Sequence, residues 1–297
     1  MSPIKILILG VTGMLGHTLF GTWIDDPEFE VWGTSRGSRI LERRFPKDWL
    51  KRIIHPVSAE DFESVMLSLI EIKPQIVINC IGIVKQLPSA QDALKTIAVN
   101  ALFPHRLAMI CRGIGAKLIQ ISSDCVFSGT KGNYGEDELP DPNDLYGRTK
   151  LLGEVCYPHC ITVRTSMIGH ELNETHGLVD WFLSQKKQVK GYTNVIFSGF
   201  PTIELATILK DFIIINPALH GLYQVSADPI SKYELLKLIA QVYQREIEIE
   251  PDNQLHIDRS LISSRFREIS GYSPPSWPEL VQEMYRDYLT APYLKND

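Results

Sequence analysis

The 297-residue sequence has no long apolar stretch and no low-complexity tract. A helix that crosses a bilayer needs roughly 18 to 20 mostly apolar residues, and no segment here reaches that length. The first apolar run, IKILILG, leads directly into a glycine turn rather than into a cleavable segment. We therefore expect a cytoplasmic protein without a membrane partner, and its 44% hydrophobic content suffices for a substantial core.

An excess of basic residues is also missing. Lys and Arg number 30 against 35 Asp and Glu, which gives a formal net charge of -5. Proteins that bind nucleic acid broadly need a basic surface that displaces counterions from phosphate. The composition therefore argues against a nucleic-acid partner, although it is compatible with a small local basic site.

Cysteine is scarce, with five residues at positions 80, 111, 125, 156 and 160 and no CxxC pair. Structural zinc sites and disulfide frameworks need cysteines at short, regular spacings. Since most of these cysteines lie in apolar segments, we expect buried free thiols and no metal site.

Short aliphatic segments alternate with longer amphipathic ones over the first 165 residues. The short segments are bounded by Gly, Pro or Asp and predict strands at residues 4–9, 30–33, 75–80, 116–122 and 160–164. Helical patterns between them cover residues 15–24, 59–72, 90–113 and 145–155. Strands that are apolar on both faces and alternate with helices indicate a doubly wound parallel sheet, a Rossmann-like α/β fold.

The pattern changes after Arg164. Helical patterns follow at residues 177–188, 203–214 and 232–244, and a Pro-rich stretch, GYSPPSWPEL, precedes a closing helix. We interpret residues 1–165 as a dinucleotide-binding domain and residues 166–297 mainly as a smaller C-terminal substrate-binding lobe. Part of the stretch 190–225 is expected to return to the first domain.

Three glycines stand three residues apart, after the first strand and at the start of the first helix. Such glycines allow a tight turn, close approach of the backbone to a pyrophosphate and close helix packing, while the helix N-terminus adds positive potential. The spacing differs from GxGxxG, and a plain strand–helix turn is the alternative. The context favours dinucleotide binding, with predicted contacts at Gly10, Thr12, Gly13, Met14, Leu15 and Gly16.

The end of the second strand reads VWGTSRGSR. In dinucleotide-binding folds an acidic side chain there binds the ribose 2′-OH of NAD, whereas Arg accommodates the 2′-phosphate of NADP. Ser35 and Arg36 stand where the acid would be, which favours NADP(H). The alternative is that Arg36 and Arg39 are solvated loop charges.

Tyr146 and Lys150 are four residues apart in a segment that follows a loop rich in Pro, Asp and Gly. On a helix this spacing places both side chains on one face, close enough for the ammonium to act on the phenol. An exposed pair on a helix surface would show the same spacing. Ser123 ends a predicted strand, where ligands of such sheets bind, and this favours an active site.

The chain resembles the extended short-chain dehydrogenase/reductase superfamily and, within it, the dTDP-4-dehydrorhamnose reductase-like branch of nucleotide-sugar enzymes. The resemblance covers essentially the whole chain. It rests on segments that occur in the family's order: GVTGMLG, VINCIG, VNALFP, ISSDCVFSG, YGRTK, RTSMIG and DRSLISSRFREISGY.

The resemblance implies a catalytic set of Ser123, Tyr146 and Lys150. A free tyrosine has a pKa of about 10, so we expect Lys150 and the positive charge of the oxidised nicotinamide to lower the pKa of Tyr146 toward neutrality. In the reducing direction, hydride would pass from NADPH to a sugar ketone. Tyr146 would protonate the developing alkoxide, and Ser123 would hydrogen-bond the same oxygen.

The resemblance also implies supporting cofactor contacts. The strand end formed by Cys80, Ile81 and Gly82 would pass beneath the ribose. Asn100 resembles the superfamily's structural asparagine, which connects to the lysine through water, and a core polar residue with local hydrogen bonds is the alternative. The remaining predicted cofactor contacts are Ser122 and Arg164.

Substrate contacts are expected on both sides of a crevice. They are Lys85, Ser123 and Asp124 near the sheet and Trp181, Lys190 and Arg259 from the C-terminal lobe. Cations would pair with a diphosphate and an aromatic ring would stack on the base, although each residue alone also fits an ordinary core or surface position. Relatives in this branch often carry aromatic sugar platforms after RTS. This chain has Met167 and Ile168 there, which leaves the sugar open.

The expected function is NADPH-dependent reduction of the 4-keto group of a nucleotide-activated 6-deoxy-4-keto hexose, in the synthesis of surface-polysaccharide precursors. A UDP-linked 2-acetamido-4-keto hexose is the close variant. A nucleotide-sugar epimerase or dehydratase on the same fold and a non-catalytic NADP-binding regulatory subunit are the alternatives. The superfamily's habit of dimerising through helices that flank the sheet is compatible with a homodimer.

Overall fold

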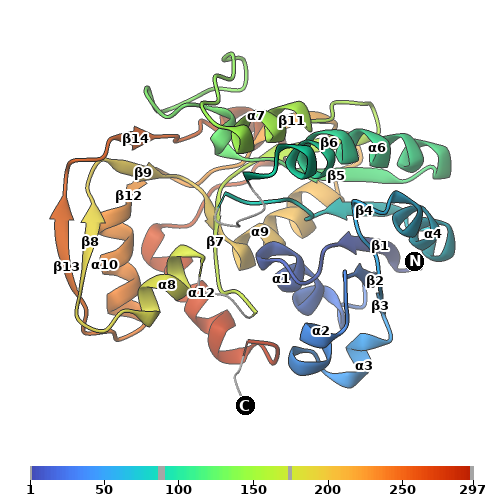
Figure 1. Ribbon diagram of the computed structural model, residues 1–297, viewed down its shortest axis with the longest axis horizontal. Coiled ribbons are helices and arrows are strands. Elements are labelled where there is room, and N and C mark those ends of the chain that lie inside the picture. The colour runs from blue at the N-terminus through green and yellow to red at the C-terminus, as the bar shows by residue number, and fades with distance from the viewer. Residues whose placement is uncertain (1, 86–90, 173–175, 295–297) are drawn as a thin grey trace.

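A seven-stranded parallel sheet forms the centre of the computed structural model, which describes residues 2–85, 91–172 and 176–294 (Figure 1). In spatial order the strands are β11 (Gly221–Gln224), β6 (Cys160–Arg164), β5 (Lys117–Ile121), β4 (Ile76–Asn79), β1 (Ile4–Leu9), β2 (Phe29–Thr34) and β3 (Ile53–Ile54). Every neighbouring pair is parallel. The chain passes from β1 to β2 on one side and returns to β4 on the other, so a switch point lies between β1 and β4.

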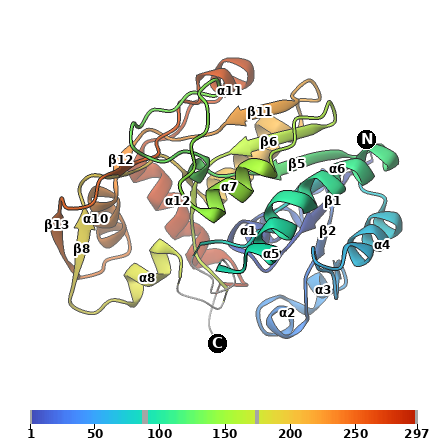
Figure 2. The ribbon, with the colours of Figure 1, turned by 45° about the horizontal axis from the view of Figure 1, so that its top comes forward.

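Successive residues of β1 enter different cores, which explains why the strand is apolar throughout. Ile6 and Ile8 belong to one buried cluster, while Leu7 and Leu9 belong to another. The first cluster includes side chains of α1 (Met14–Trp23), α2 (Arg39–Arg44), α9 (Thr202–Ile208), η4 (Leu209–Ile214) and α12 (Trp277–Thr290), and α3 (Lys47–Leu50) packs against it. The second includes α4 (Phe62–Ile72) and α6 (Phe103–Ile114). The sheet is therefore covered on both faces, and the predicted doubly wound α/β fold is confirmed (Figure 2).

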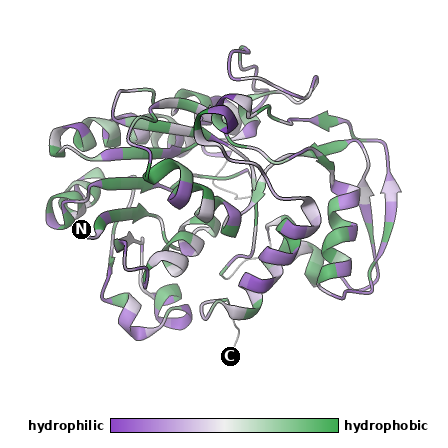
Figure 3. Ribbon diagram, turned by 180° about the vertical axis from the view of Figure 1, so that it is seen from behind, coloured by the Kyte–Doolittle hydropathy of each residue, from purple (hydrophilic) through white to green (hydrophobic). Residues whose placement is uncertain are grey.

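The C-terminal part adds short strands and helices beside this sheet (Figure 1). β8 (Gln188–Tyr192) pairs with β13 (Glu248–Asp252), β9 (Val195–Phe197) lies between β12 (Ile230–Ser231) and β14 (Ile257–Asp258), and β7 (Met167–Ile168) pairs with β10 (Phe200–Pro201). The helices are α8 (Leu178–Ser184), α10 (Lys232–Val242), α11 (Ser264–Ser270) and α12. Figure 3 shows that the central strands are mostly hydrophobic, while hydrophilic residues gather on the helices and outer segments.

Most predicted elements agree with the structure to within a few residues. Residues 4–9 and 160–164 match β1 and β6, and the other three strands differ at their ends. The helix expected at 59–72 begins at Phe62, because Asp61 caps it by accepting a hydrogen bond from Ser64 N at 3.4 Å. The prediction for 177–188 is wrong after Ser184, where the chain becomes extended and enters β8.

The long helix predicted at 90–113 is divided in the structure. Residue 90 lies outside the described residues, and the rest forms α5 (Ala93–Thr96), η2 (Ile97–Leu102) and α6. The middle segment is a π-helix that carries Asn100 inward. A π-helix inserted into an α-helix often marks a functional position.

The cysteines are free thiols, as expected, but not all of them are buried. Cys111 and Cys160 are buried, Cys80 and Cys125 are half-buried, and Cys156 is exposed. Across the described ranges, no group of His, Cys, Asp and Glu side chains is arranged to hold a metal ion. Among the helices described, none has the length and apolar character that crossing a membrane requires.

Candidate active site

The chain turns sharply where β1 meets α1. Gly10 has a φ of +88°, in the left-handed region that favours glycine. Its N–H donates to the carbonyl oxygen of Thr34 at 3.2 Å, which ties the turn to the end of β2. A Cβ on Gly16 would lie 2.2 Å from the Gly10 carbonyl oxygen, so only glycine lets α1 pack this closely against the turn.

The N-terminus of α1 is suited to bind an anion. Gly13 is the N-cap, so no side chain accepts a hydrogen bond from the first turn, and that turn carries no acidic residue. Gly13 is exposed and Thr12 and Met14 are half-buried, whereas Leu15 belongs to the core. Unsatisfied N–H groups at a helix N-terminus attract phosphate, so the turn has the features that a pyrophosphate site needs.

Ser35 and Arg36 lie beyond β2 as the sequence predicts, and they differ in character. Ser35 is buried and donates a hydrogen bond to the carbonyl oxygen of Gly37 at 2.8 Å. Arg36 is exposed, and the described residues give it no hydrogen bond or ion pair. A solvated guanidinium beside this turn remains available to a phosphate.

Asn100 clamps the loop that follows β4. Its Oδ1 accepts from Ile83 N at 2.8 Å, its Nδ2 donates to Ile83 O at 2.9 Å, and Thr149 of α7 (Leu145–Leu152) lies 3.5 Å from the same nitrogen. These contacts correspond to the local hydrogen bonds that were the alternative for this residue. The clamp holds the strand end next to the glycine turn, where a Cβ on Gly10 would approach Ile81 Cγ1 at 3.0 Å.

Two neighbours of that clamp are also predicted cofactor contacts. Burial raises the pKa of the Cys80 thiol to about 12, so it is an inert neutral group at physiological pH. Gly82 also lies next to the clamp, since its Cβ position is 3.5 Å from Asn100 Oδ1, an ordinary contact distance.

Ser123, Tyr146 and Lys150 meet at the carboxyl end of β5. Ser123 is buried, accepts from Cys125 N at 3.1 Å, donates to Asp124 Oδ1 at 3.1 Å and is close enough to Tyr146 to act on the pKa of its phenol. Asp144 caps α7 by accepting from Gly147 N at 2.7 Å, which fixes the helix that carries Tyr146 and Lys150. The Lys150 ammonium is buried and donates to Ile121 O at 2.6 Å.

The protein's own groups alone do not lower the pKa of Tyr146, and the joint effect of Lys150 and the oxidised nicotinamide stays a prediction. Burial raises the pKa of Tyr146 well above its usual range, Cys125 and Asp124 raise it further, and the Ser123 hydroxyl opposes the rise. The ammonium donates to a backbone carbonyl instead. Burial also lowers the pKa of Lys150 to about 8, against an opposing effect of Glu154.

Ser122 and Arg164, both predicted cofactor contacts, share one buried partner. Ser122 Oγ donates to Glu154 Oε1 at 2.7 Å, and Arg164 donates to both carboxylate oxygens at 2.8 and 2.7 Å. The guanidinium carbon of Arg164 also lies 5.3 Å from the ring centroid of Phe127. The Nη1 atom of Arg164 is buried and has no hydrogen-bond partner among the described residues, and the cofactor roles of both side chains stay predictions.

The predicted substrate residues near the sheet lie together. The Lys85 ammonium forms an ion pair with Asp144. Arg259 is half-buried and donates from Nε to Phe127 O at 2.9 Å. Burial raises the pKa of Asp124, and the nearby charge of Arg259 opposes that rise. Both cations therefore lie at the end of the sheet where Ser123 is found.

Trp181 and Lys190 lie on two consecutive elements of the C-terminal lobe, α8 and β8. Trp181 lies on α8 and is 38% exposed. Lys190 lies on β8, where its exposed ammonium pairs with Asp252 of β13 at 3.1 Å. Figure 1 places this two-stranded sheet at the edge of the molecule, away from α7. The substrate roles of Trp181 and Lys190 stay predictions.

Sequence reasoning missed two residues near this pair. Glu154 follows Lys150 by four positions, the same spacing that singled out Tyr146 and Lys150, so a signal for it existed. Lys232 begins α10 far along the chain, and its charge interacts with Asp124 and Arg259. A lysine at a helix start is an ordinary surface feature, so the sequence held no signal for it.

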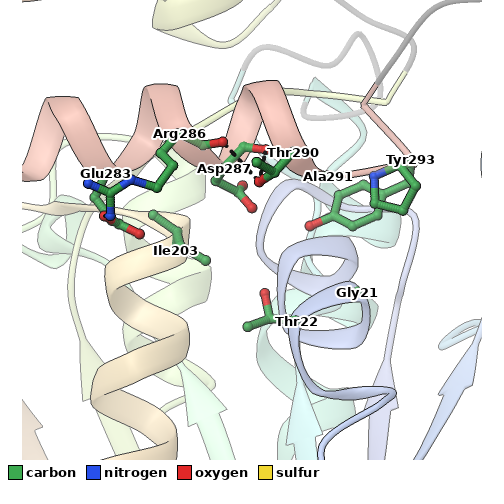
Figure 4. A pocket seen from close by; sticks show the side chains of 10 residues that line it. Gly21, Thr22, Ile203, Glu283, Arg286, Asp287, Thr290, Ala291 and Tyr293 are labelled. Carbon is green, nitrogen blue, oxygen red and sulfur yellow. Dashed lines mark hydrogen bonds and ion pairs between the residues drawn. The ribbon is translucent and has the colours of Figure 1, made fainter.

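A cavity of about 290 Å³ lies elsewhere, between α1, α9 and α12 (Figure 4). Its lining includes Thr22, Ile203, Asp287 and Tyr293, and none of the predicted site residues. The geometry that can do chemistry is therefore at the carboxyl ends of β1, β4 and β5 rather than in this cavity.

Comparison with curated proteins finds two kinds of relative. The beta subunit of methionine adenosyltransferase 2 from Xenopus tropicalis is 27% identical over 254 residues, which cover 80% of this chain and 72% of that protein. The dTDP-4-dehydrorhamnose reductase of Streptomyces griseus is 37% identical over 158 residues, which cover 52% of this chain and 46% of that protein.

Solved structures share the fold over nearly the whole chain. The dTDP-4-dehydrorhamnose reductase of Bacillus anthracis, solved in complex with NADP, aligns with a TM-score of 0.78 at 21% identity, covering 96% of this chain and 99% of that one. A model of the RmlD substrate binding domain matches residues 4–289. The chain belongs to the RmlD substrate binding domain family.

Proposed function

We propose that this protein is an NADPH-dependent reductase of the 4-keto group of a nucleotide-activated 6-deoxy-4-keto hexose, acting in the synthesis of surface-polysaccharide precursors. The observation that carries the proposal is the meeting of Ser123, Tyr146 and Lys150 beside the glycine turn at one end of the sheet. The Streptomyces griseus and Bacillus anthracis reductases support the reaction class.

The residues around the glycine turn fit a dinucleotide. Gly10, Gly13 and Gly16 would let the pyrophosphate reach the uncapped N-terminus of α1, and Arg36 would take a 2′-phosphate. The NADP bound to the Bacillus anthracis relative supports this choice of cofactor. When bound, NADPH supplies a hydride.

Side chains of the protein would carry out the proton transfer. A phenol whose pKa is raised keeps its proton at neutral pH, so Tyr146 is ready to act as the acid that protonates an alkoxide. Ser123, which lies close enough to act on that phenol, would bind the same oxygen of the substrate. With the cofactor bound, the oxidised nicotinamide and Lys150, one turn further along α7, would together stabilise the phenolate left after proton transfer.

As expected from the sequence, residues 1–165 would bind the cofactor and residues 166–297 would mainly bind the substrate. β11 joins the central sheet from the second half of the sequence, which fits a return of part of 190–225. The proposed location is the cytoplasm, and the proposed assembly, a homodimer, is tested by sedimentation of the purified protein.

The test is a panel of 4-keto nucleotide sugars, both dTDP-6-deoxy and UDP-2-acetamido forms, with NADPH oxidation as the readout. At least one sugar should be reduced, and Tyr146→Phe should lower the rate by about a hundredfold or more, because general acid catalysis contributes that much. Tyr157→Phe, at a half-exposed tyrosine that contacts His105, serves as control. A Tyr146→Phe variant as fast as the parent would contradict the assigned role.

A second candidate function is that of a non-catalytic NADP-binding subunit. It is favoured by the relatives named methionine adenosyltransferase 2 subunit beta, one of which matches 80% of this chain. Its signature would be intact NADPH binding, measured by fluorescence, without oxidation in the presence of any sugar of the panel. The intact set of Ser123, Tyr146 and Lys150 favours the enzyme.

A further inference from the structure

Ser123 leads into a short turn, and the loop after this turn contacts a distant segment of the chain. The turn is η3 (Asp124–Val126), and Phe127 N closes it by donating to Asp124 O at 3.0 Å. The loop then runs beside residues 257–262, which begin with β14 and belong to the C-terminal lobe. The two parts of the protein therefore meet a few residues from the proposed catalytic serine.

Tyr134 joins the loop to the C-terminal lobe through its backbone. Its N–H donates to Ser260 O at 2.8 Å, and its carbonyl oxygen accepts from Ile262 N at 2.8 Å. A pair of backbone hydrogen bonds on both sides of one residue fixes the register of two segments. We call the contacts between residues 127–134 and 257–262 the latch.

Two glycines let the latch close. Gly129 has a φ of +87°, and its carbonyl oxygen accepts from Asp258 N at 2.8 Å. Gly132 has a φ of +76°, and a Cβ on it would lie 2.2 Å from Asp258 Oδ2. Both positions combine a left-handed backbone with close approach to the other segment, which favours glycine.

The side chain of Tyr134 holds the loop in this shape. The residue is 4% exposed, and its ring stacks on Phe127 with a centroid distance of 4.3 Å and an interplanar angle of 12°. Its phenol oxygen accepts from Gly129 N at 3.2 Å and from Lys131 N at 3.1 Å. One oxygen thus satisfies two backbone N–H groups of the loop that contacts the C-terminal lobe.

The same side chain belongs to a small buried cluster beside the proposed active site. Its members are Val126, Phe127, Tyr134 and Leu261, with Leu151 of α7 packed against them. The cluster therefore connects the turn after Ser123, the helix that carries Lys150 and the C-terminal lobe.

We infer that Tyr134 is a positioning residue that fixes the substrate-binding lobe against the turn and the helix of the active site. The inference rests on the proposed function, in which residues 166–297 mainly bind the substrate and Ser123 and Tyr146 act on its ketone. A small displacement of a bound substrate from the reacting groups lowers the rate strongly, so the contact between the two parts matters for turnover.

Two variants open the latch in different ways. Tyr134→Phe keeps the ring and removes the oxygen, which leaves the N–H groups of Gly129 and Lys131 without this acceptor. Gly132→Ala keeps the oxygen and pushes the loop away from Asp258.

Each variant has a matched control. Gly135→Ala lies on the same chain segment, has no left-handed backbone, and its Cβ would be 3.9 Å from Glu138 Oε1, an ordinary contact. Tyr157→Phe also removes a phenol hydrogen bond, the one to His105 Nδ1 at 3.2 Å.

The first measurement is hydrogen exchange followed by mass spectrometry, which requires no turnover. An unsatisfied N–H in a buried loop favours local opening, so peptides covering residues 257–262 should exchange about tenfold faster in Tyr134→Phe and in Gly132→Ala. Exchange in β1 and β4 should stay at the parent rate. Both controls should match the parent throughout.

The second measurement is steady-state kinetics with any sugar that the parent reduces. The KM for the sugar should rise about tenfold in both variants. The kcat should change less, because the hydrogen bond from Lys150 to Ile121 O and the Asp144 cap of α7 lie outside the latch. The Kd for NADPH should not change, since none of the predicted cofactor contacts belongs to the latch.

The inference is overturned if exchange at residues 257–262 is unchanged in Tyr134→Phe. It is also overturned if exchange rises equally throughout the chain, or if the KM for a reduced sugar stays at the parent value. If the parent reduces no sugar, the reductase proposal fails, and exchange at residues 257–262 alone decides whether Tyr134 fixes the lobe.

Discussion

Arg164 donates two hydrogen bonds to Glu154, from Nε at 2.8 Å and from Nη2 at 2.7 Å, and both side chains are buried. The pair links β6 to the end of α7, ten positions apart in the chain. Glu154 also accepts the Ser122 hydroxyl and raises the pKa of Lys150. One carboxylate thus connects the strand end that carries Ser123 with the helix that carries Lys150.

Glu154→Gln should destabilise the protein by about 3 kcal/mol or more, because it leaves the Arg164 charge buried without a counterion. Urea unfolding at pH 7 measures the change. The control is Asp48→Asn, which breaks the exposed Lys51–Asp48 pair and should give no measurable change.

The double variant Glu154→Gln, Arg164→Met distinguishes the effect of the unpaired Arg164 charge from the effect of lost packing. It removes the buried charge as well as its partner, so it should recover most of the stability that Glu154→Gln loses. A double variant as unstable as the single one would show that the pair contributes through packing alone.

The stability of the protein should rise between pH 8 and 9.5 through Lys150. Its pKa is about 8 in the folded state and 10.5 in the reference state, so the unfolded chain binds more protons in this window. Below pH 8 the Lys150 ammonium is charged in the folded state, so its burial lowers the free energy of unfolding. This cost decreases as pH rises and Lys150 loses its proton. Relative to Lys150→Met, the parent should gain about 2 kcal/mol over the window, as measured by urea unfolding. Parallel pH profiles of the two proteins would contradict a depressed pKa.

Asp287→Asn should stabilise the protein at pH 7 by about 1 kcal/mol. Burial raises the pKa of Asp287 from 3.8 to about 6, so the folded state binds more protons between these values and its stability falls as pH rises through them. The amide removes that loss, and the advantage should vanish below pH 4. Thermal unfolding at pH 4 and pH 7 measures it, with Asp25→Asn at an exposed turn as control. An equal effect at both pH values would rule out titration as its cause.

Gly16→Ala should cost about 2 kcal/mol and weaken NADPH binding. The new Cβ would lie 2.2 Å from Gly10 O and 2.9 Å from Gly10 C, both of them backbone atoms that cannot move without opening the turn. Gly113→Ala on α6 is the matched control, since nothing lies within 4 Å of its Cβ position and the change should be neutral or mildly stabilising. Unfolding and NADPH fluorescence give the two readouts. An unchanged melting temperature in Gly16→Ala would mean that the turn adapts.

The doubly wound sheet could be predicted from the residues alone, because the central strands are mainly apolar and their alternation with helices is a local pattern. The glycine turn could also be predicted, as could the position of Tyr146 and Lys150 on one face of a helix. Both features depend on spacing within a few residues. The end of the helix at Ser184 was not readable in this way, because strand pairing of β8 with β13 overrode the helical pattern.

The electrostatics of the site, by contrast, follow from how the chain folds in space. The pKa of Tyr146 depends on burial and on Asp124 and Cys125, which come from another strand end. Arg259 and Lys232 reach the same place from the C-terminal lobe, more than a hundred positions beyond Ser123. Charge interactions depend on distance in space and on exclusion of water, and a linear pattern of residue types carries neither quantity.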